Sequence, residues 1–257
     1  MKKLFSQIYL ALIFIFLYAP IVTLMVYSFN ETKASRFSGF TLKWYVELFQ
    51  SEMMMEALVN TLFIATISAS VATIIGVISC IGINALNARS RGIFLALNNI
   101  PILNSELVTG LSLMLVFIAF GITAGYKTIL IAHITFNIPY VILSVMPRLR
   151  KTNKSTYEAA MDLGASPIYA FFKVVFPELV PGIVSGFLLA FTMSLDDFII
   201  TYFTRGAGIN TLSTLIYSEV RKGIKPSINA LSTIMFVSVL ILLIFIKKPR
   251  NKTSPTA

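Results

Sequence analysis

The sequence has one cysteine, one histidine and few charged residues, and each scarcity excludes a class of protein. With Cys80 as its single cysteine, the chain can form no internal disulfide and no cysteine-based metal site. Only 12% of its 257 residues are charged, whereas 56% are hydrophobic and the mean hydropathy is +0.82. Such a composition has too few polar side chains to cover a soluble globule. The sequence therefore predicts a membrane protein.

Several catalytic and binding signatures are also missing. The formal net charge is +10, but the basic residues are scattered between apolar runs and form no continuous basic face for nucleic acid. No G-x-x-x-x-G-K-[ST] loop occurs, so this chain cannot by itself be an ATPase. The G-x-S-x-G and H-E-x-x-H patterns of hydrolases are absent as well. These absences favour a transport subunit over an enzyme.

Six charge-poor runs are each long enough for a transmembrane helix of about 20 residues. They cover residues 4–30, 57–88, 92–126, 128–147, 179–204 and 226–246. The first is longer than the apolar part of a signal peptide, so it is predicted to be a retained helix. The expected fold is an all-α polytopic protein with six transmembrane helices. Its expected parts are a first helix (1–30), an outer loop with an amphipathic helix (31–56), a five-helix core (57–246) and a basic tail (247–257).

The distribution of Lys and Arg predicts the orientation in the membrane. Placing both termini inside puts thirteen of the 21 basic residues in the cytoplasm and eight outside. The last outer loop weakens this bias because it carries Arg205, Arg221, Lys222 and Lys225. We expect both termini to be cytoplasmic, and we expect these outer cations to contact acidic residues of a delivering protein.

The cytoplasmic segment 148–178 is long for a simple connector. Ser155 with Glu158 three residues later predicts a capped helix from about Thr156, which Gly164 should end. Ser166 and Pro167 predict the start of a second short helix that runs to Val175 and ends before Pro177. Two short helices joined at a glycine make a compact knob.

The stretch EAAMDLGASPIYAFFKVVFPELVP resembles the EAA loop of permease subunits of binding-protein-dependent ABC importers, the MetI-like family. The matching residues are Glu158, Ala159, Ala160, Gly164 and Pro177. The stretches YAPIVTLMVYSFN, TLKWYVELF, HITFNIPYVILSVMPRL and SLDDFIITYFTRG extend the likeness over nearly the whole chain, toward the spermidine/putrescine permeases of the PotC type.

This resemblance implies a set of partners. A PotB-type second permease completes the pore, and a PotA-type ATPase dimer docks on the EAA loops and binds ATP and Mg²⁺. This chain therefore needs no cofactor of its own. A PotD-type substrate-binding protein, periplasmic or lipid-anchored, delivers the polyamine at the outer face. ATPase closure is expected to move the knob and the attached fourth and fifth spans, which switches access to the pathway.

Three acidic residues lie within the predicted spans: Glu106, Asp196 and Asp197. Acids inside a membrane usually mark a substrate pathway or a pairing site. A kink at Pro101 is expected to leave Glu106 near the midplane, with the two aspartates in the outer half. A polyamine is an extended multivalent cation, so carboxylates along a channel suit it.

Helical spacing separates the two aspartates. If the fifth span stays helical, Asp197 shares a face with Ser194, Thr201 and Thr204 and is the better candidate to face the pore. Asp196 then binds substrate as well or pairs with the partner permease. The resemblance assigns substrate passage to Asp196, Asp197, Ser194, Glu106 and Trp44. An acid that some relatives carry after GAS in the EAA loop is replaced here by Pro167.

Other interpretations stay open for each of these residues. The aspartates fit capping groups at a break in the span or a buried pair with an arginine, and Glu106 fits a structural hydrogen bond to Asn104 or to a neighbouring helix. Trp44 fits an interfacial anchor. His133 is expected to hydrogen-bond within the helix packing rather than to bind a metal, because no second ligand lies near it in sequence.

The competing functions are a permease for another small solute, an ion-coupled secondary transporter and a membrane prenyltransferase. The last needs DDxxD, and DDFIIT lacks the third aspartate. An ion-coupled transporter should show inverted repeats, and none is evident. An anion importer should present arginines where this chain has aspartates.

Overall fold

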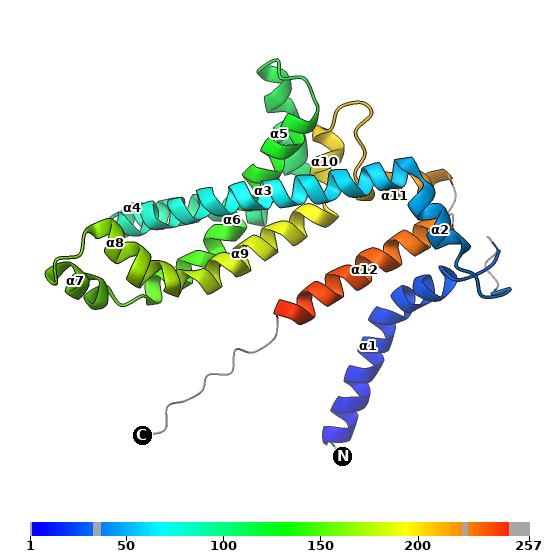
Figure 1. Ribbon diagram of the computed structural model, residues 1–257, viewed down its shortest axis with the longest axis horizontal. Coiled ribbons are helices and arrows are strands. Elements are labelled where there is room, and N and C mark those ends of the chain that lie inside the picture. Colours follow the sequence, from blue (N-terminus) through cyan, green and yellow to red (C-terminus); the bar gives the residue numbers. More distant parts are fainter. Residues whose placement is uncertain (1, 33–36, 223–225, 247–257) are drawn as a thin grey trace. The chain divides into compact units, whose positions relative to one another are not determined.

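The computed structural model describes residues 2–32, 37–222 and 226–246 (Figure 1). These residues form helices and no β-strand, with one isolated antiparallel bridge between Asn30 and Phe40. The chain divides into two compact units, residues 1–55 with 216–257 and residues 56–215. The expectation of an all-α fold is confirmed.

The first unit contains α1 (Lys2–Tyr27), α2 (Lys43–Gln50), α12 (Pro226–Ile246) and the end of α11 (Leu212–Lys222). α12 packs against both α1 and α2. α2 is the amphipathic helix expected in segment 31–56, and it buries Trp44 and Leu48. Its position at a membrane interface stays a prediction.

The second unit contains α3 (Glu52–Ala85, whose first residues belong to the first unit), α4 (Ala88–Leu103), α5 (Glu106–Ala119), α6 (Tyr126–Lys151), α9 (Phe176–Asp196) and α10 (Ile199–Thr204). α6 and α9 cross closely because α9 presents glycines to α6. A Cβ on Gly182 would lie 3.2 Å from the Ser144 carbonyl oxygen, and one on Gly186 would lie 3.3 Å from the Val141 Cα. This tight crossing is the core of the second unit.

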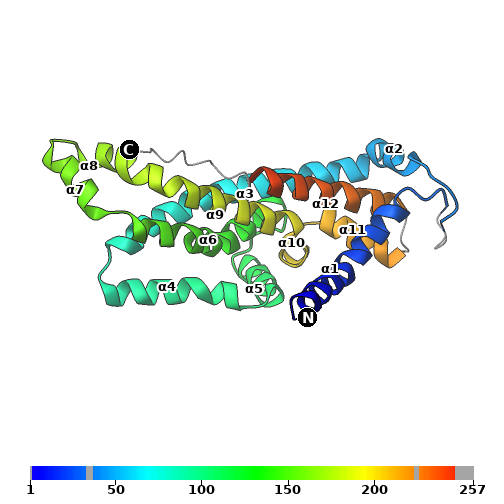
Figure 2. The ribbon, with the colours of Figure 1, turned by 90° about the horizontal axis from the view of Figure 1, so that it is seen from below.

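Four stretches of the described chain are long and apolar enough to cross a membrane: Phe5–Tyr27, Glu52–Ala85, Tyr126–Lys151 and Pro167–Asp196. α4 and α5 together form a further, broken span, bent by 103° (Figure 2). α12 is apolar and 21 residues long, although its Pro226–Leu240 part alone is shorter than a full span. Each of these elements overlaps one of the six predicted runs, although the fifth run, 179–204, is divided between α9 and α10.

The expected kink at Pro101 is wrong. Pro101 lies inside α4, and the chain bends instead at Asn104 and Ser105. The Ser105 side chain accepts a hydrogen bond from the Val108 amide at 3.4 Å and so begins α5 as a new helix. Glu106 is consequently the first residue of a helix rather than a residue inside a kinked one.

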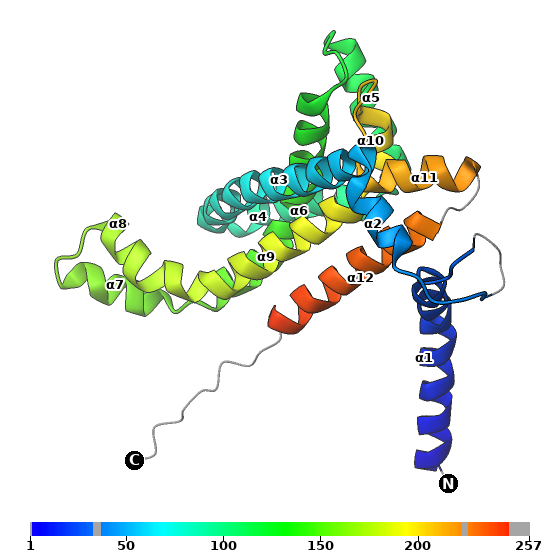
Figure 3. The same ribbon diagram turned by 45° about the vertical axis from the view of Figure 1, so that its right-hand side comes forward.

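The knob is built differently from its prediction at two points (Figure 3). α7 (Lys154–Asp162) begins two residues earlier than expected, since Asn153 rather than Ser155 caps it by accepting from the Ser155 amide at 3.0 Å. Gly164, with φ +89°, ends it as expected. α8 (Pro167–Ala170) starts at the Ser166 cap as predicted.

The second short helix does not end before Pro177. A π-helical turn, Phe171–Val175, joins α8 to α9, and Pro177 lies in the first turn of α9. A proline is tolerated there because its missing amide needs no partner in a first turn. The knob is therefore continuous with the fifth span, so a displacement of one passes directly to the other.

Candidate functional site

The fifth span is broken at the aspartate pair. α9 ends at Asp196, and Asp197 has an extended backbone with ψ 125° before α10 begins. One carboxylate oxygen of Asp197 accepts from the Ile200 amide at 3.2 Å, and the other accepts from the Thr201 amide and the Thr201 hydroxyl, each at 2.8 Å. Asp197 thus satisfies the free amides of the first turn of α10, as a cap does.

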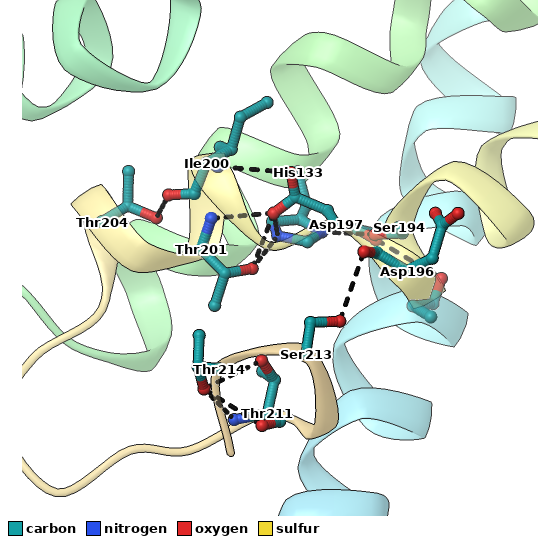
Figure 4. A network of polar contacts seen from close by, with 12 residues as sticks. His133, Ser194, Asp196, Asp197, Ile200, Thr201, Thr204, Thr211, Ser213 and Thr214 are labelled. Atoms are coloured by element: carbon teal, nitrogen blue, oxygen red, sulfur yellow. Dashed lines mark hydrogen bonds and ion pairs between the residues drawn. The ribbon is translucent and has the colours of Figure 1, made fainter. Parts of the chain in front are cut away.

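His133 of α6 extends this cap into a buried network (Figure 4). Its Nε2 lies 2.9 Å from the Thr201 hydroxyl and 3.4 Å from the Asp197 carboxylate. Its Nδ1 bonds to the Ser194 hydroxyl, which in turn lies 2.9 Å from the Ser68 hydroxyl of α3. All five side chains are buried. The network therefore joins α3, α6, α9 and α10.

The polar groups of this network are paired with one another. Thr201 donates to Asp197, so its oxygen is free to accept from His133 Nε2–H. His133 Nδ1 and the Ser194 hydroxyl share a hydrogen bond, and the Ser68 hydroxyl next to Ser194 also bonds to the Ala65 carbonyl oxygen at 3.3 Å. Every member is satisfied, and buried networks of this kind fix one arrangement of the surrounding helices. The expectation that His133 hydrogen-bonds within the packing is confirmed.

Asp196 is placed quite differently from its neighbour. Its side chain is exposed, whereas Asp197 is only 8% exposed. The Asp196 carbonyl oxygen accepts from the Ser213 hydroxyl at 3.2 Å, and Figure 4 shows its carboxylate lying apart from the His133 network. Within the described chain the carboxylate forms no salt bridge. Of the two aspartates, Asp196 is therefore the one whose side chain is exposed.

This arrangement contradicts the assumption that led us to prefer Asp197 over Asp196 as the residue that faces the pore. The prediction assumed one continuous helix through both aspartates, and that assumption is wrong because the helix ends between them. Asp197 does contact Thr201 and is linked to Ser194 through His133, but inside a buried network rather than along an open face. The alternative that an aspartate caps a break in the span is confirmed for Asp197.

Glu106 lies in the first turn of α5 and is exposed. α5 packs against α10, and Gly110, one turn beyond Glu106, makes this contact close: a Cβ there would lie 3.2 Å from the Ile200 Cα. The contact between α5 and α10 brings the start of α5, with Glu106, toward the break between α9 and α10. Within the described residues no hydrogen bond joins Glu106 to Asn104. The structure therefore gathers the three membrane acids around two helix breaks.

Trp44 belongs to the first unit and is 5% exposed. Its indole N–H donates to the Asn30 carbonyl oxygen at 2.6 Å, and the Lys43 ammonium lies 5.6 Å from the ring centre. These contacts hold α2 against the segment that follows α1. The ring is thus a packing element of its own unit.

The basic residues of the last outer loop have internal partners wherever they are described. Arg205 donates to the Asn210 side chain at 2.7 Å, and Lys222 pairs with Glu219 at 2.9 Å. Arg221 lies over the Tyr217 ring. Lys225 lies outside the described residues. Engagement of a delivering protein by these cations stays a prediction.

The residues predicted to form an EAA loop are accessible. Glu158, Ala159, Gly164 and Pro177 are exposed, and Ala160 is half-buried. Leu163, beside the glycine, is 90% exposed. An apolar side chain held out on a knob of two short helices is a feature of a protein-docking surface.

Curated proteins similar to this chain are polyamine transport permeases. The chain is 41% identical over 235 residues to the putrescine transport system permease protein PotI of Escherichia coli K12, covering 88% of this chain and 83% of that protein. It is 34% identical to the spermidine/putrescine transport system permease protein PotC of Haemophilus influenzae, covering 92% of each chain. The PotC protein of E. coli K12 is 33% identical, covering 92% of this chain and 90% of that protein.

Solved importers share the fold. A bacterial ABC transporter that imports alginate matches with a TM-score of 0.70 at 19% identity, over 95% of this chain and 93% of that one. The methionine transporter MetNI in an inward-facing conformation matches with a TM-score of 0.60 at 18% identity. The match covers 76% of this chain and 94% of that one. The family model described as "Binding-protein-dependent transport system inner membrane component" matches residues 72–247. The chain therefore belongs to this family: it is a multi-pass inner membrane protein and a permease subunit of an ABC importer, not itself an enzyme.

Proposed function

We propose that this permease carries polyamines, putrescine or spermidine, and forms half of their transmembrane pathway. The observation that carries the proposal is the accessible carboxylate of Asp196 at a break in the fifth span, with Glu106 at a second break beside it. Relatives at 33–41% identity are named as putrescine or spermidine/putrescine permeases. Exposed carboxylates would repel an anionic substrate, whereas they attract a cation.

In this proposal the cation leaves water in steps. An ammonium group that enters the membrane needs a carboxylate to replace part of its hydration. Asp196 offers the first such group, and Glu106 receives the next ammonium of the extended chain. Tyr140 of α6 packs against the apolar cluster that includes Ile200 of α10, and in this proposal its ring faces the path. Asp197 and Thr201 fix the geometry of this break, because the Asp197 carboxylate caps the first turn of α10.

The proposed assembly has one PotB-type partner permease, a PotA-type ATPase dimer that binds ATP and Mg²⁺, and a PotD-type binding protein. The exposed EAA knob supports docking of the ATPase at the cytoplasmic face. Both termini of this chain then lie in the cytoplasm, in agreement with the excess of Lys and Arg on that side.

We expect uptake of radiolabelled putrescine by proteoliposomes that contain the complete complex to require ATP and the binding protein. The physical reason is that this chain has no nucleotide site and needs a partner to move its knob. Uptake driven by an ion gradient without ATP would identify a secondary transporter instead. ATP-dependent uptake of a neutral or anionic solute, with no polyamine uptake, would reject the substrate while keeping the permease.

We expect Gly164→Asp to uncouple ATP hydrolysis from uptake. Gly164 has φ +89°, where a side chain costs about 1 to 2 kcal/mol, and it lies at the tip of the knob. Gly121→Asp is the matched control, because Gly121 also has a positive φ of 65° and open space around it but lies away from the knob. The measurement is the ratio of polyamine transported to ATP hydrolysed. An equal fall in both variants would reject the docking role of the knob.

A further inference from the structure

A cavity of about 720 Å³ lies beneath the knob, within the second unit. Its walls come from the last turns of α3 and α6, the first turn of α4, α7 and the π-helical turn. Three cationic side chains line it, and Glu158 is the one acid among the lining residues: the cations are Arg91, Arg150 and Lys154. The lining therefore carries an excess of two positive charges.

These cations are not neutralised by the protein. Within the described residues, Arg91, Arg150 and Lys154 take part in no salt bridge. Each comes from a different helix: Arg91 from α4, Arg150 from α6 and Lys154 from α7. Three like charges directed into one cavity repel each other, and they favour an anion that compensates them.

Most of the other residues that line the cavity are apolar, among them Leu149 and Phe171. Free phosphate or a nucleotide phosphate group would gain nothing from such walls, whereas a phospholipid places a phosphodiester beside acyl chains. The cavity also lies where the long apolar helices α3 and α6 end, and in a bilayer the ends of such helices would lie near the lipid headgroups.

We propose that this cavity binds the headgroup of an anionic phospholipid such as phosphatidylglycerol from the cytoplasmic leaflet. The three cations hold the phosphodiester, and the acyl chains leave along the apolar walls. Basic pockets between membrane helices at the cytoplasmic side are suited to such headgroups. The bound lipid then lies between the knob and the span ends, so it stiffens the connection through which knob movement reaches the fifth span. The inference uses the proposed orientation but not the proposed substrate.

The test is native mass spectrometry of the complete complex, purified from membranes of equal parts phosphatidylethanolamine and phosphatidylglycerol. We expect the complex to retain phosphatidylglycerol selectively, and Arg91→Gln with Arg150→Gln to reduce its occupancy at least about tenfold. The control, Arg89→Gln with Lys151→Gln, removes two exposed charges from the same helices that do not line the cavity. This control should retain the lipid.

Four results would overturn the proposal. Equal retention of both lipids would show that no anionic headgroup is recognised, and equal loss in the two double variants would show a diffuse surface effect. Release of the ATPase subunit by the cavity variant, at unchanged lipid occupancy, would assign the cavity to a protein interface. Excess inorganic phosphate in the buffer should not displace the lipid, and displacement would identify a site for free phosphate.

Discussion

Asp196→Asn is expected to reduce polyamine uptake about tenfold to a hundredfold while the complex still assembles, because a charged hydrogen-bond partner contributes about 1.5 to 3 kcal/mol. Asparagine keeps the size of the side chain and loses its charge. Since the Asp196 carboxylate is exposed and forms no salt bridge in the described chain, its loss leaves no buried group unpaired. Radiolabelled uptake and the yield of purified complex measure the two effects separately.

The control for this variant is Thr192→Val, one turn earlier on α9. The Thr192 hydroxyl bonds to the Leu188 carbonyl oxygen of its own helix, so its removal changes neither the charge nor the break. We expect uptake by this control to stay within a factor of about two, because its bond is local to the helix. Asp196→Glu, which keeps the charge, should recover part of the uptake. Normal uptake in Asp196→Asn would remove Asp196 from the pathway.

The spans were predictable because they depend on local composition. Long apolar runs and the Lys and Arg between them define where helices cross, and neither signal needs a distant partner. The likeness of the EAA loop came from residue spacing alone. Gly164 was predictable for the same reason, since one residue with a positive φ is enough to end a helix.

The ends of helices were less predictable. Asn153 and Ser155 are both good caps two residues apart, and sequence alone does not choose between them. Pro101 was the obvious site for a kink, yet the capping serine at position 105 determines the break. In each case two local signals compete, and the tertiary packing selects one.

The role of Asp197 depends on a residue in another helix. Its partner His133 is separated from it by 64 positions, and nothing in a single sequence pairs them. One signal was available in the stretch DFIIT. An aspartate that accepts hydrogen bonds from the backbone amides three and four residues later marks the start of a helix, and Asp197 does so. The apolar run around the pair outweighed that signal, so the segment was interpreted as one helix.

Asp197→Asn is expected to destabilise the permease rather than to weaken substrate binding. The carboxylate accepts three hydrogen bonds and lies 3.4 Å from His133 Nε2, and an amide has only one oxygen to replace its two. Leaving a buried donor unpaired costs about 1 to 3 kcal/mol. Thermal unfolding of the purified complex should shift to lower temperature, with the KM for polyamine in the remaining folded fraction unchanged.

A double-mutant cycle with His133→Ala isolates the contact. Because the two side chains belong to one network, their effects on the free energy of unfolding should be non-additive by about 0.5 to 3 kcal/mol. Asp196→Asn combined with His133→Ala should be additive, since Asp196 lies outside the network. If Asp197→Asn instead abolished uptake with an unchanged unfolding temperature, Asp197 would be the substrate ligand, and the division of roles between the two aspartates would be reversed.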